Sequence, residues 1–321
     1  MAARAPRPAS GSVTVSIVTP TLNQARYLQR TLDSVRAQTY PVGEHIVVDG
    51  GSTDGTLDIL RREGERGTIR WMSGPDDGMY DAVNKGLATA SGDILAYLPS
   101  DDAYFPWAVE TIVDRFASRP RLDLAFGDGI TIEEDFGTQI LRLYAPFDRI
   151  SLANYASLLQ PAVFWRRSLF EQLGGFDARM RYVADLDYWL RAAAAGATIA
   201  HVDEVIALER VHEGRLSSAR REAMQREEQE MRARNAGRDG GPAARQRAAK
   251  RYLRWQRWLW LRFVLASTLQ PLPGPWHRFL SHGRVIVHRG QALSGLRPRR
   301  HNRLRGAIES RLAVDIIAED E

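Results

Sequence analysis

Short apolar runs alternate with helical patterns over the first third of the chain. Four runs have the length and the β-branched content of buried strands, at 13–18, 45–48, 68–72 and 94–98. Three segments between them space their apolar residues as one face of a helix does, at 25–37, 56–62 and 79–90. Strands that alternate with helices over short loops predict βαβ units, and therefore an α/β fold with a mostly parallel, Rossmann-like sheet flanked by helices.

The pattern changes after the fourth run. Two β-like segments between Arg121 and Tyr144 predict an antiparallel piece added to the sheet, and another apolar run covers 160–165. A helix is expected over 183–195, followed by strand-like segments at 198–202 and 205–208. From Ala219 the composition shifts to Arg, Glu, Gln and Ala, which predicts a solvated helix interrupted at 237–242. We therefore place a domain boundary near Ser218.

Polar and acidic residues follow each of the first four predicted strands. They are Thr19 and Asn23, Asp49 and Ser52, Asp76 and Asp77, and Asp101 and Asp102. Parallel strands present their carboxyl ends at one edge of a sheet, where ligands of open α/β folds bind, so this rim predicts a nucleotide site. An alternative for Ser100, Asp101 and Asp102 is to cap the helix expected near Pro106.

Composition and motifs narrow the possible chemistry. The 321 residues contain no cysteine, which excludes thiolate metal sites and a cysteine nucleophile. The segment 50–55, GGSTDG, fits neither a P-loop nor G-x-G-x-x-G. Residues 1–12 are rich in Ala, Pro and Arg without the apolar core of a signal peptide, so we expect a disordered tail and a cytoplasmic protein. The net charge of +5 predicts attraction to phosphates, either of nucleic acid or of an anionic membrane.

Four motifs occur in the order in which they occur in family 2 glycosyltransferases. They are SIVTPTLNQARYL, IVVDGGSTDGT, DDGMYDAVNKGLATASGDILAYLPSDD and LQPAVFWRRSLFEQLGGFDARMRYVADLDYWLRAAAAG. The chain therefore resembles this family, the inverting nucleotide-sugar enzymes with a GT-A fold, over roughly 13–218. The resemblance implies a catalytic domain at 13–218, after the tail at 1–12 and before a helical Arg- and Trp-rich region at 219–321.

The resemblance also implies which residues bind the donor. Those expected to contact the nucleoside, the diphosphate or the sugar are Thr19, Pro20, Thr21, Asn23, Asp49, Ser52, Asp77, Gly78, Asn84, Lys85, Asp101 and Arg210. Ser52 and Asp54 have an alternative role, which is to fix the turn and cap the next helix. The alternative for Lys85 is a lysine on the exposed surface of its helix. The basic residues of this chain are mostly arginine, which favours a ligand role for this lysine.

Metal binding and catalysis are assigned by the same resemblance. Asp102 and His212 are the expected ligands of Mg²⁺ or Mn²⁺, cations that prefer oxygen ligands and neutralise a departing diphosphate. Ser100 replaces the first acid of the family's Asp-x-Asp triplet, so ligation depends mainly on Asp102. Asp185 is the expected general base, although the family often has Glu-Asp where this chain has Ala184-Asp185. Its alternatives are a helix cap at Asp185 and a base at Asp187.

The segment Arg251 to Leu269 interleaves tryptophan with arginine. It fits a helix at a membrane interface, or one that packs its aromatic face on the catalytic domain. The second basic stretch, 297–305, adds attraction to anionic lipid. No nucleic-acid-binding motif accompanies these arginines, so nucleic acid is not an expected partner.

These observations together predict a metal-dependent inverting glycosyltransferase. Its donor is expected to be a UDP-, dTDP- or GDP-linked sugar, and its acceptor a hydroxyl of a glycan or a lipid-linked molecule. We expect it to act in bacterial cell-surface polysaccharide biosynthesis, in the cytoplasm or at the inner face of the cell membrane. A nucleotidyltransferase is an alternative, but Thr19 to Asn23 lacks the Gly-rich basic loop expected there. A non-catalytic nucleotide-sugar-binding or membrane-adaptor protein is the other.

Overall fold

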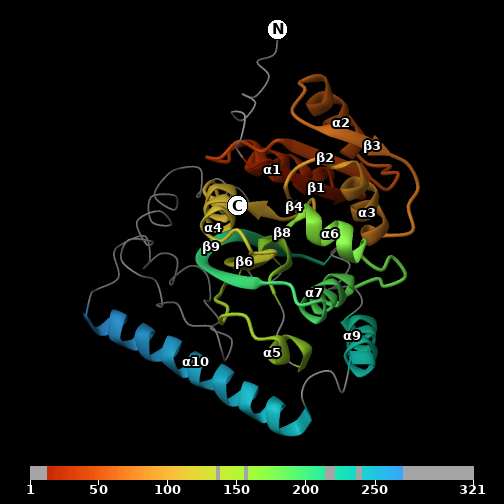
Figure 1. Ribbon diagram of the computed structural model, residues 1–321. Helices are drawn as coiled ribbons and strands as arrows, with labels where there is room; N and C mark the ends of the chain where they lie inside the picture. The colour runs from red at the N-terminus through yellow and green to blue at the C-terminus, as the bar shows by residue number, and fades with distance from the viewer. Residues whose placement is uncertain (1–12, 135–137, 155–157, 214–220, 236–240, 270–321) are drawn as a thin grey trace.

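The computed structural model describes residues 13–134, 138–154, 158–213, 221–235 and 241–269, and the side chains of the last helix up to Trp255. The sheet has nine strands in the order β3-β2-β1-β4-β8-β6-β9-β5, with β7 paired to β6. Helices cover both of its faces (Figure 1). The predicted tail at 1–12, the boundary near Ser218 and the basic stretch at 297–305 lie outside the described residues.

The first four strands form the parallel half of the sheet. They are β1 (Val15–Thr21), β2 (Glu44–Asp49), β3 (Arg70–Ser73) and β4 (Ile94–Tyr97). Between them run α1 (Ala25–Arg36), α2 (Thr56–Glu65) and α3 (Met79–Thr89). Every residue of β1 and β4 is buried, as expected of strands covered on both faces. The predicted βαβ order is confirmed here.

The second half of the sheet is mixed. Its strands are β5 (Ala103–Tyr104), β6 (Leu124–Glu133), β7 (Thr138–Arg142), β8 (Val163–Arg166) and β9 (Ile199–Val211). β7 is antiparallel to β6, as predicted. β8 is antiparallel to both β4 and β6, whereas β9 is parallel to β6. The two strand-like segments predicted at 198–202 and 205–208 are one strand, β9.

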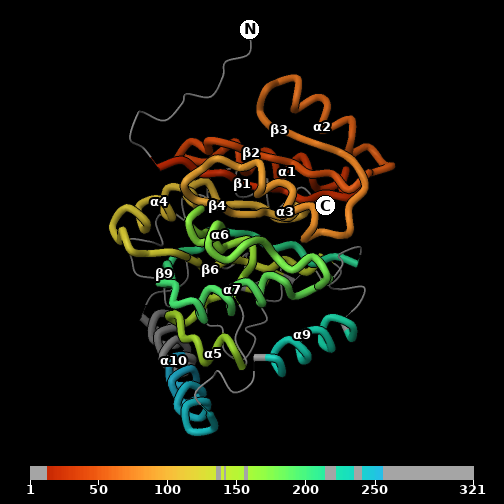
Figure 2. The backbone as a smooth tube through the Cα atoms, turned by 45° about the vertical axis from the view of Figure 1, so that its right-hand side comes forward, coloured from red at the N-terminus to blue at the C-terminus, as the bar shows by residue number. Residues whose placement is uncertain are grey.

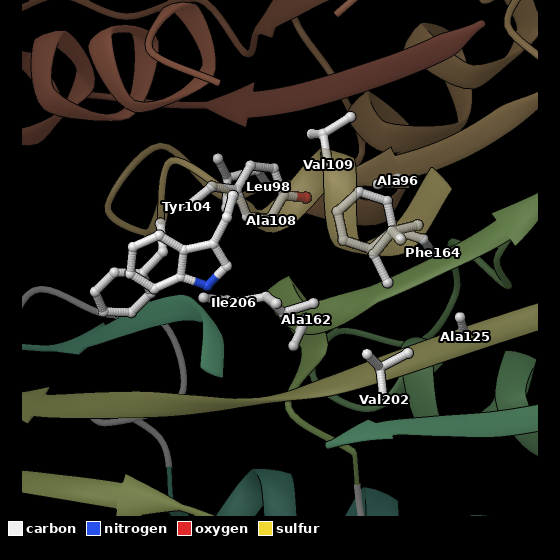
Figure 3. Packing of buried hydrophobic residues seen from close by; sticks show 14 of the residues in the cluster. Ala96, Leu98, Tyr104, Ala108, Val109, Ala125, Ala162, Phe164, Val202 and Ile206 are labelled. Atoms are coloured by element: carbon white, nitrogen blue, oxygen red, sulfur yellow. The ribbon is translucent and has the colours of Figure 1, made fainter. Parts of the chain in front are cut away.

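The two larger of three apolar cores lie on opposite faces of this sheet. Along β4, Ile94 and Ala96 face one core, whereas Leu95 and Tyr97 face the other. Figure 3 shows the first core, in which Phe164 of β8 lies against side chains of β4 and α4 (Ala108–Ser118). The second core lies beneath α3, α6 (Arg167–Leu173) and α7 (Ala184–Ala194). β4 is therefore clamped from both faces, which fixes the position of the loop that follows it.

Two helices follow the sheet domain. They are α9 (Arg221–Asn235) and α10 (Gly241–Leu269). Both contact α5 (Arg149–Asn154), and Figures 1 and 2 show α9 below α7. Met231 of α9 and Ala248 of α10 are buried, and Trp255 packs against the first core. The described side chains of α10 thus follow the packing alternative. Among the described residues, no helix is both long and apolar enough to cross a bilayer.

Candidate functional site

The carboxyl ends of β1 and β2 are tied together by the turn that follows β2. Asp49 is 1% exposed and ends β2, where it pairs in register with Thr21. Its carboxylate accepts hydrogen bonds from the Ser52 hydroxyl, from the backbone N–H groups of Gly51 and Ser52, and from Ser73 Oγ at 2.6 Å. Asp49 therefore builds the rim of the sheet, and its predicted contact with the nucleoside stays a prediction.

The loop after β1 is held by the same turn. Asn23 has a φ of 53°, and its backbone N–H donates to Ser52 Oγ at 2.7 Å. Its Oδ1 accepts the N–H of Thr53 at 2.8 Å. Asp54 accepts the N–H of Ala25 at 3.0 Å and that of Thr56 at 2.9 Å, so it serves the starts of α1 and α2. Ser52 and Asp54 thus make the turn-fixing contacts of the alternative stated above.

Three residues at the carboxyl end of β1, Thr19, Pro20 and Thr21, are the predicted nucleoside contacts. Thr19 Oγ1 lies 2.9 Å from His45 Nε2, and both residues are buried. Pro20 lies in the buried strand itself. The buried Thr21 Oγ1 has no hydrogen-bond partner among the described residues, although it lies one position before the exposed Leu22. The predicted contact of Thr21 with the nucleoside stays a prediction.

The segment before α3 and the first turns of α3 carry the predicted diphosphate ligands. Lys85 Nζ lies 2.8 Å from an Asp81 carboxylate oxygen and donates to the Pro75 carbonyl at 3.1 Å. The hydrogen bond with Asp81 raises the pKa of Lys85. The Asn84 amide donates to the Phe176 carbonyl at 2.8 Å and accepts the Phe176 N–H at 2.9 Å. Asn84 thus anchors the 175–176 loop, and its role at a diphosphate stays a prediction.

Asp77 and Gly78 shape the start of α3. The Asp77 carbonyl accepts a hydrogen bond from Arg181 Nη1 at 2.6 Å. Gly78 has a φ of 120°, and a Cβ atom there would lie 2.7 Å from Arg181 Nη1. A side chain at position 78 would therefore be strained and would displace the guanidinium. The predicted donor loop is thus in direct contact with the segment that precedes α7.

The acidic pair after β4 lies against the end of β9. Asp102 is 1% exposed, and its Oδ1 accepts the backbone N–H of Arg210 at 2.8 Å. Asp101 Oδ2 lies 3.1 Å from His212 Nε2. α4 begins after Trp107 without a side-chain cap, so the capping alternative for the acidic pair is wrong. β9 therefore brings Arg210 and His212 to the two carboxylates, as the motif order implied.

A buried ion pair supports this corner. Glu134 lies 2.7 Å from Arg210 Nη1 and accepts the Tyr27 hydroxyl at 2.8 Å. Burial, together with the hydrogen bond to Glu134, raises the pKa of Tyr27 to about 12. The Tyr27 ring lies 4.6 Å from the His212 ring, centroid to centroid. The sequence analysis missed Tyr27 and Glu134, because no local pattern relates residues that meet only through the fold.

Asp185 occupies the first turn of α7. Its Oδ1 accepts the N–H of Leu186 at 2.8 Å and lies 3.2 Å from the Tyr80 hydroxyl. Burial first, and then the charge of Asp185, raise the pKa of Tyr80 well above its usual value. Asp187 instead pairs with Arg191 at 2.8 Å on its own helix. Of the two acids, Asp185 is the one directed toward α3 and β4.

The electrostatics of Tyr97 connect the two acidic positions. Burial raises the pKa of Tyr97 well above its usual value, and Tyr80, Asp185 and Asp102 raise it further. Tyr97 is the last residue of β4, and its ring lies 6.5 Å from the Tyr80 ring, centroid to centroid. Because the Tyr80 hydroxyl contacts Asp185, and Asp102 lies in the loop after β4, both acids lie near the carboxyl end of β4.

The candidate ligands of a divalent cation are the side chains of Asp101, Asp102 and His212. No group of three or more His, Asp or Glu side chains able to hold a metal occurs among the described residues. What the fold brings together is the adjacent carboxylates Asp101 and Asp102, with His212 against the first of them. Mg²⁺ commonly takes one or two carboxylates and completes its shell with substrate phosphates and water. The residues therefore fit a cation that arrives with a diphosphate.

Comparisons with known proteins show the family of this chain. The sequence model for "Glycosyl transferase family 2" matches residues 16–174. An uncharacterized glycosyltransferase of Mycobacterium tuberculosis is 39% identical over 183 residues, which are 56% of this chain and 69% of the relative. A PGL/p-HBAD biosynthesis glycosyltransferase of Mycobacterium bovis is 35% identical over 196 residues, 60% of this chain and 74% of the relative.

Solved structures of S. aureus TarS 1-349 have a similar fold. The complex with UDP matches with a TM-score of 0.54 at 18% identity, covering 94% of this chain and 90% of that one. The complex with UDP-GlcNAc matches with a TM-score of 0.53 at 18% identity, covering 64% of this chain and only 61% of that one. At this identity the similarity concerns the fold, and it confirms the predicted GT-A-type α/β architecture.

Proposed function

Because the chain belongs to glycosyl transferase family 2, we propose that it is an inverting enzyme that moves a sugar from a nucleoside diphosphate to an acceptor hydroxyl. The observation that carries the proposal is that two acidic positions meet near Tyr97 at the end of β4. They are the Asp101–Asp102 pair in the loop after β4 and Asp185 at the start of α7. Family membership favours glycosyl transfer over the nucleotidyltransferase and adaptor alternatives.

The reaction is a single displacement. The acceptor oxygen attacks the anomeric carbon while its proton passes to the Asp185 carboxylate. The bond between that carbon and the phosphate oxygen breaks, and its electron pair leaves with the nucleoside diphosphate. Attack from the face opposite the leaving group inverts the configuration at the anomeric carbon. Asp185 suits this role because Tyr80 and the Leu186 N–H orient its carboxylate from one side.

The donor is proposed to be a UDP-, dTDP- or GDP-linked sugar. Solved structures of the same fold include a UDP-GlcNAc complex, which supports a nucleotide-sugar donor in general. The proposed donor contacts are those of the sequence analysis, with the Thr21 hydroxyl at the β1 end now the most direct candidate.

Mg²⁺ or Mn²⁺ is the proposed cofactor. Asp102 and His212 would hold it, with Asp101 beside them, and it would neutralise the charge of the departing diphosphate. The proximity of Asp101 to His212 at the end of β9 supports this assignment.

The acceptor is proposed to be a glycan or lipid-linked molecule in bacterial cell-surface or glycolipid biosynthesis. The M. bovis relative is named for PGL/p-HBAD biosynthesis, which supports this class. Exposed cations on α10, at Arg247, Lys250 and Arg254, support a peripheral contact with the inner face of the cell membrane. Flotation with anionic liposomes tests it: reversing these three charges to glutamate should release the full chain, and unchanged flotation would refute the contact.

The test of the reaction is a transfer assay across donor sugars with and without Mn²⁺. Asp102→Ala and Asp185→Ala should each abolish transfer while far-UV circular dichroism stays unchanged. Asp187→Asn is the matched control on α7, because Asp187 contacts Arg191 of its own helix. EDTA should stop the wild-type reaction, and added Mn²⁺ should restore it. Full activity in Asp185→Ala would refute the assignment of the base.

A further inference from the structure

Helix α9 lies outside the residues that the family model matches, yet it holds the segment in front of Asp185. Glu227 of α9 accepts three consecutive backbone N–H groups. Its Oε2 accepts that of Arg181 at 3.0 Å, and its Oε1 accepts those of Tyr182 at 2.9 Å and Val183 at 3.0 Å. Three hydrogen bonds to one carboxylate fix both the position and the orientation of this segment.

The restrained segment leads directly into the helix that carries the proposed base. Val183 is the residue before α7, and Asp185 is the second residue of that helix. Val183 has no side-chain cap of its own to offer. The negative charge of Glu227 lies where the N–H groups at the start of a helix leave positive potential, so its interaction with α7 is favourable.

The same segment also reaches the donor side. Tyr182 offers its carbonyl to the Tyr80 hydroxyl, the group that contacts Asp185. Arg181 extends its guanidinium to the Asp77 carbonyl at the start of α3. A shift of residues 181–183 would therefore move both Asp185 and the Asp77–Gly78 loop.

We propose that Glu227 is a positioning residue for Asp185, and that α9 completes the catalytic unit. The inference rests on the proposed function, in which Asp185 accepts the acceptor proton. Catalytic groups must be held closely to the productive geometry, so a loosened base lowers turnover more than it lowers donor binding.

The experiment compares three full-length variants. Glu227→Ala removes all three acceptors, and its kcat should fall about tenfold or more. The donor KM should rise by a smaller factor, because the same segment also contacts the Asp77–Gly78 loop. Glu227→Gln keeps one carbonyl oxygen and should retain intermediate turnover. Glu230→Ala is the matched control, because Glu230 lies on the same helix, is 69% exposed and pairs only loosely with Arg234 at 3.8 Å. It should behave as the wild type.

Hydrogen exchange gives a readout that does not depend on activity. The amides of Tyr182 and Val183 should exchange faster in Glu227→Ala than in Glu230→Ala, whereas amides of β4 should stay protected in both. If Glu227→Ala fails to fold, Glu227→Gln carries the test: faster exchange at Arg181 with reduced kcat supports the proposal.

The proposal is overturned if folded Glu227→Ala keeps wild-type kcat, if exchange at 181–183 does not change, or if Glu230→Ala loses as much turnover. Failure of the proposed function looks different. The wild type would then transfer no sugar from any donor, while the exchange comparison would still decide whether Glu227 holds the segment before α7.

Discussion

His45 should make the stability of this protein depend on pH below neutrality. The residue lies in β2, is 7% exposed, and has its Nε2 2.9 Å from Thr19 Oγ1. Burial lowers the pKa of His45 from 6.5 to about 3, because a charged imidazole would lose its hydration inside the sheet. The folded protein therefore keeps His45 neutral where the unfolded chain protonates it.

The size of the effect follows from the two pKa values. Between about pH 6.5 and about pH 3 the unfolded chain binds more protons at this residue, so the free energy of unfolding decreases as the pH falls. The loss is about 1.4 kcal/mol for each pH unit below the unfolded pKa. At about pH 5 the contribution of His45 is a loss of about 2 kcal/mol relative to about pH 7.5.

Urea unfolding of the wild type and of His45→Gln at about pH 5 and about pH 7.5 measures the contribution of His45 to the free energy of unfolding. Glutamine does not titrate, and its amide is able to hydrogen-bond to the Thr19 hydroxyl. The lowered pKa values of Glu44 and Glu63 also reduce the free energy of unfolding in acid. Both proteins contain these residues, so their contribution cancels in the comparison. The wild type should lose about 2 kcal/mol more than the variant. Equal losses in the two proteins would show that His45 is not the group that binds the proton.

Three further predictions follow from contacts in the site. Tyr80→Phe removes the hydroxyl beside Asp185 and should lower kcat about tenfold with little change in donor KM, measured by steady-state kinetics. Asn84→Ala breaks both hydrogen bonds to Phe176 and should lower the free energy of unfolding by about 2 kcal/mol in urea titrations. Glu134→Gln removes the charge opposite the buried Arg210 and should cost about 3 kcal/mol by the same assay. An unchanged value in any of these measurements would contradict the role given to that side chain.

The parallel half of the sheet was predictable because its signals are local. Each of β1, β2 and β4 is an apolar run that ends in a polar turn, and the intervening helices bury one face. The direction of β8 was not predictable in this way. Its run at 163–166 pairs antiparallel with β4 and β6, and an apolar run reads the same in either direction. Direction depends on the path of the connecting chain.

The sequence motifs named candidate site residues, but they did not predict the hydrogen-bond partners of those residues. The motif order assigned Asn84, Asp102 and Asp185 to one site, and those roles stay predictions. It assigned Asn84 to a diphosphate, whereas its amide is occupied by the Phe176 backbone, which is 92 positions away in sequence. Partners at such a separation leave no periodic pattern. Glu227, which contacts residues 44 to 46 positions before it, was missed for the same reason.

The register of β9 against β6 explains how the carboxyl end of β9 reaches Asp101 and Asp102. β9 advances from Val202 to Ala207 while its partner β6 advances only from Gly127 to Gly129, so β9 contains three more residues across this irregularity. Side chains alternate between the faces of a strand, so an odd insertion exchanges the faces of every later residue relative to β6. The break between the apolar runs 198–202 and 205–208 predicted two strands. The interruption instead sets the register in which the backbone of Arg210 meets Asp102 and the ring of His212 meets Asp101.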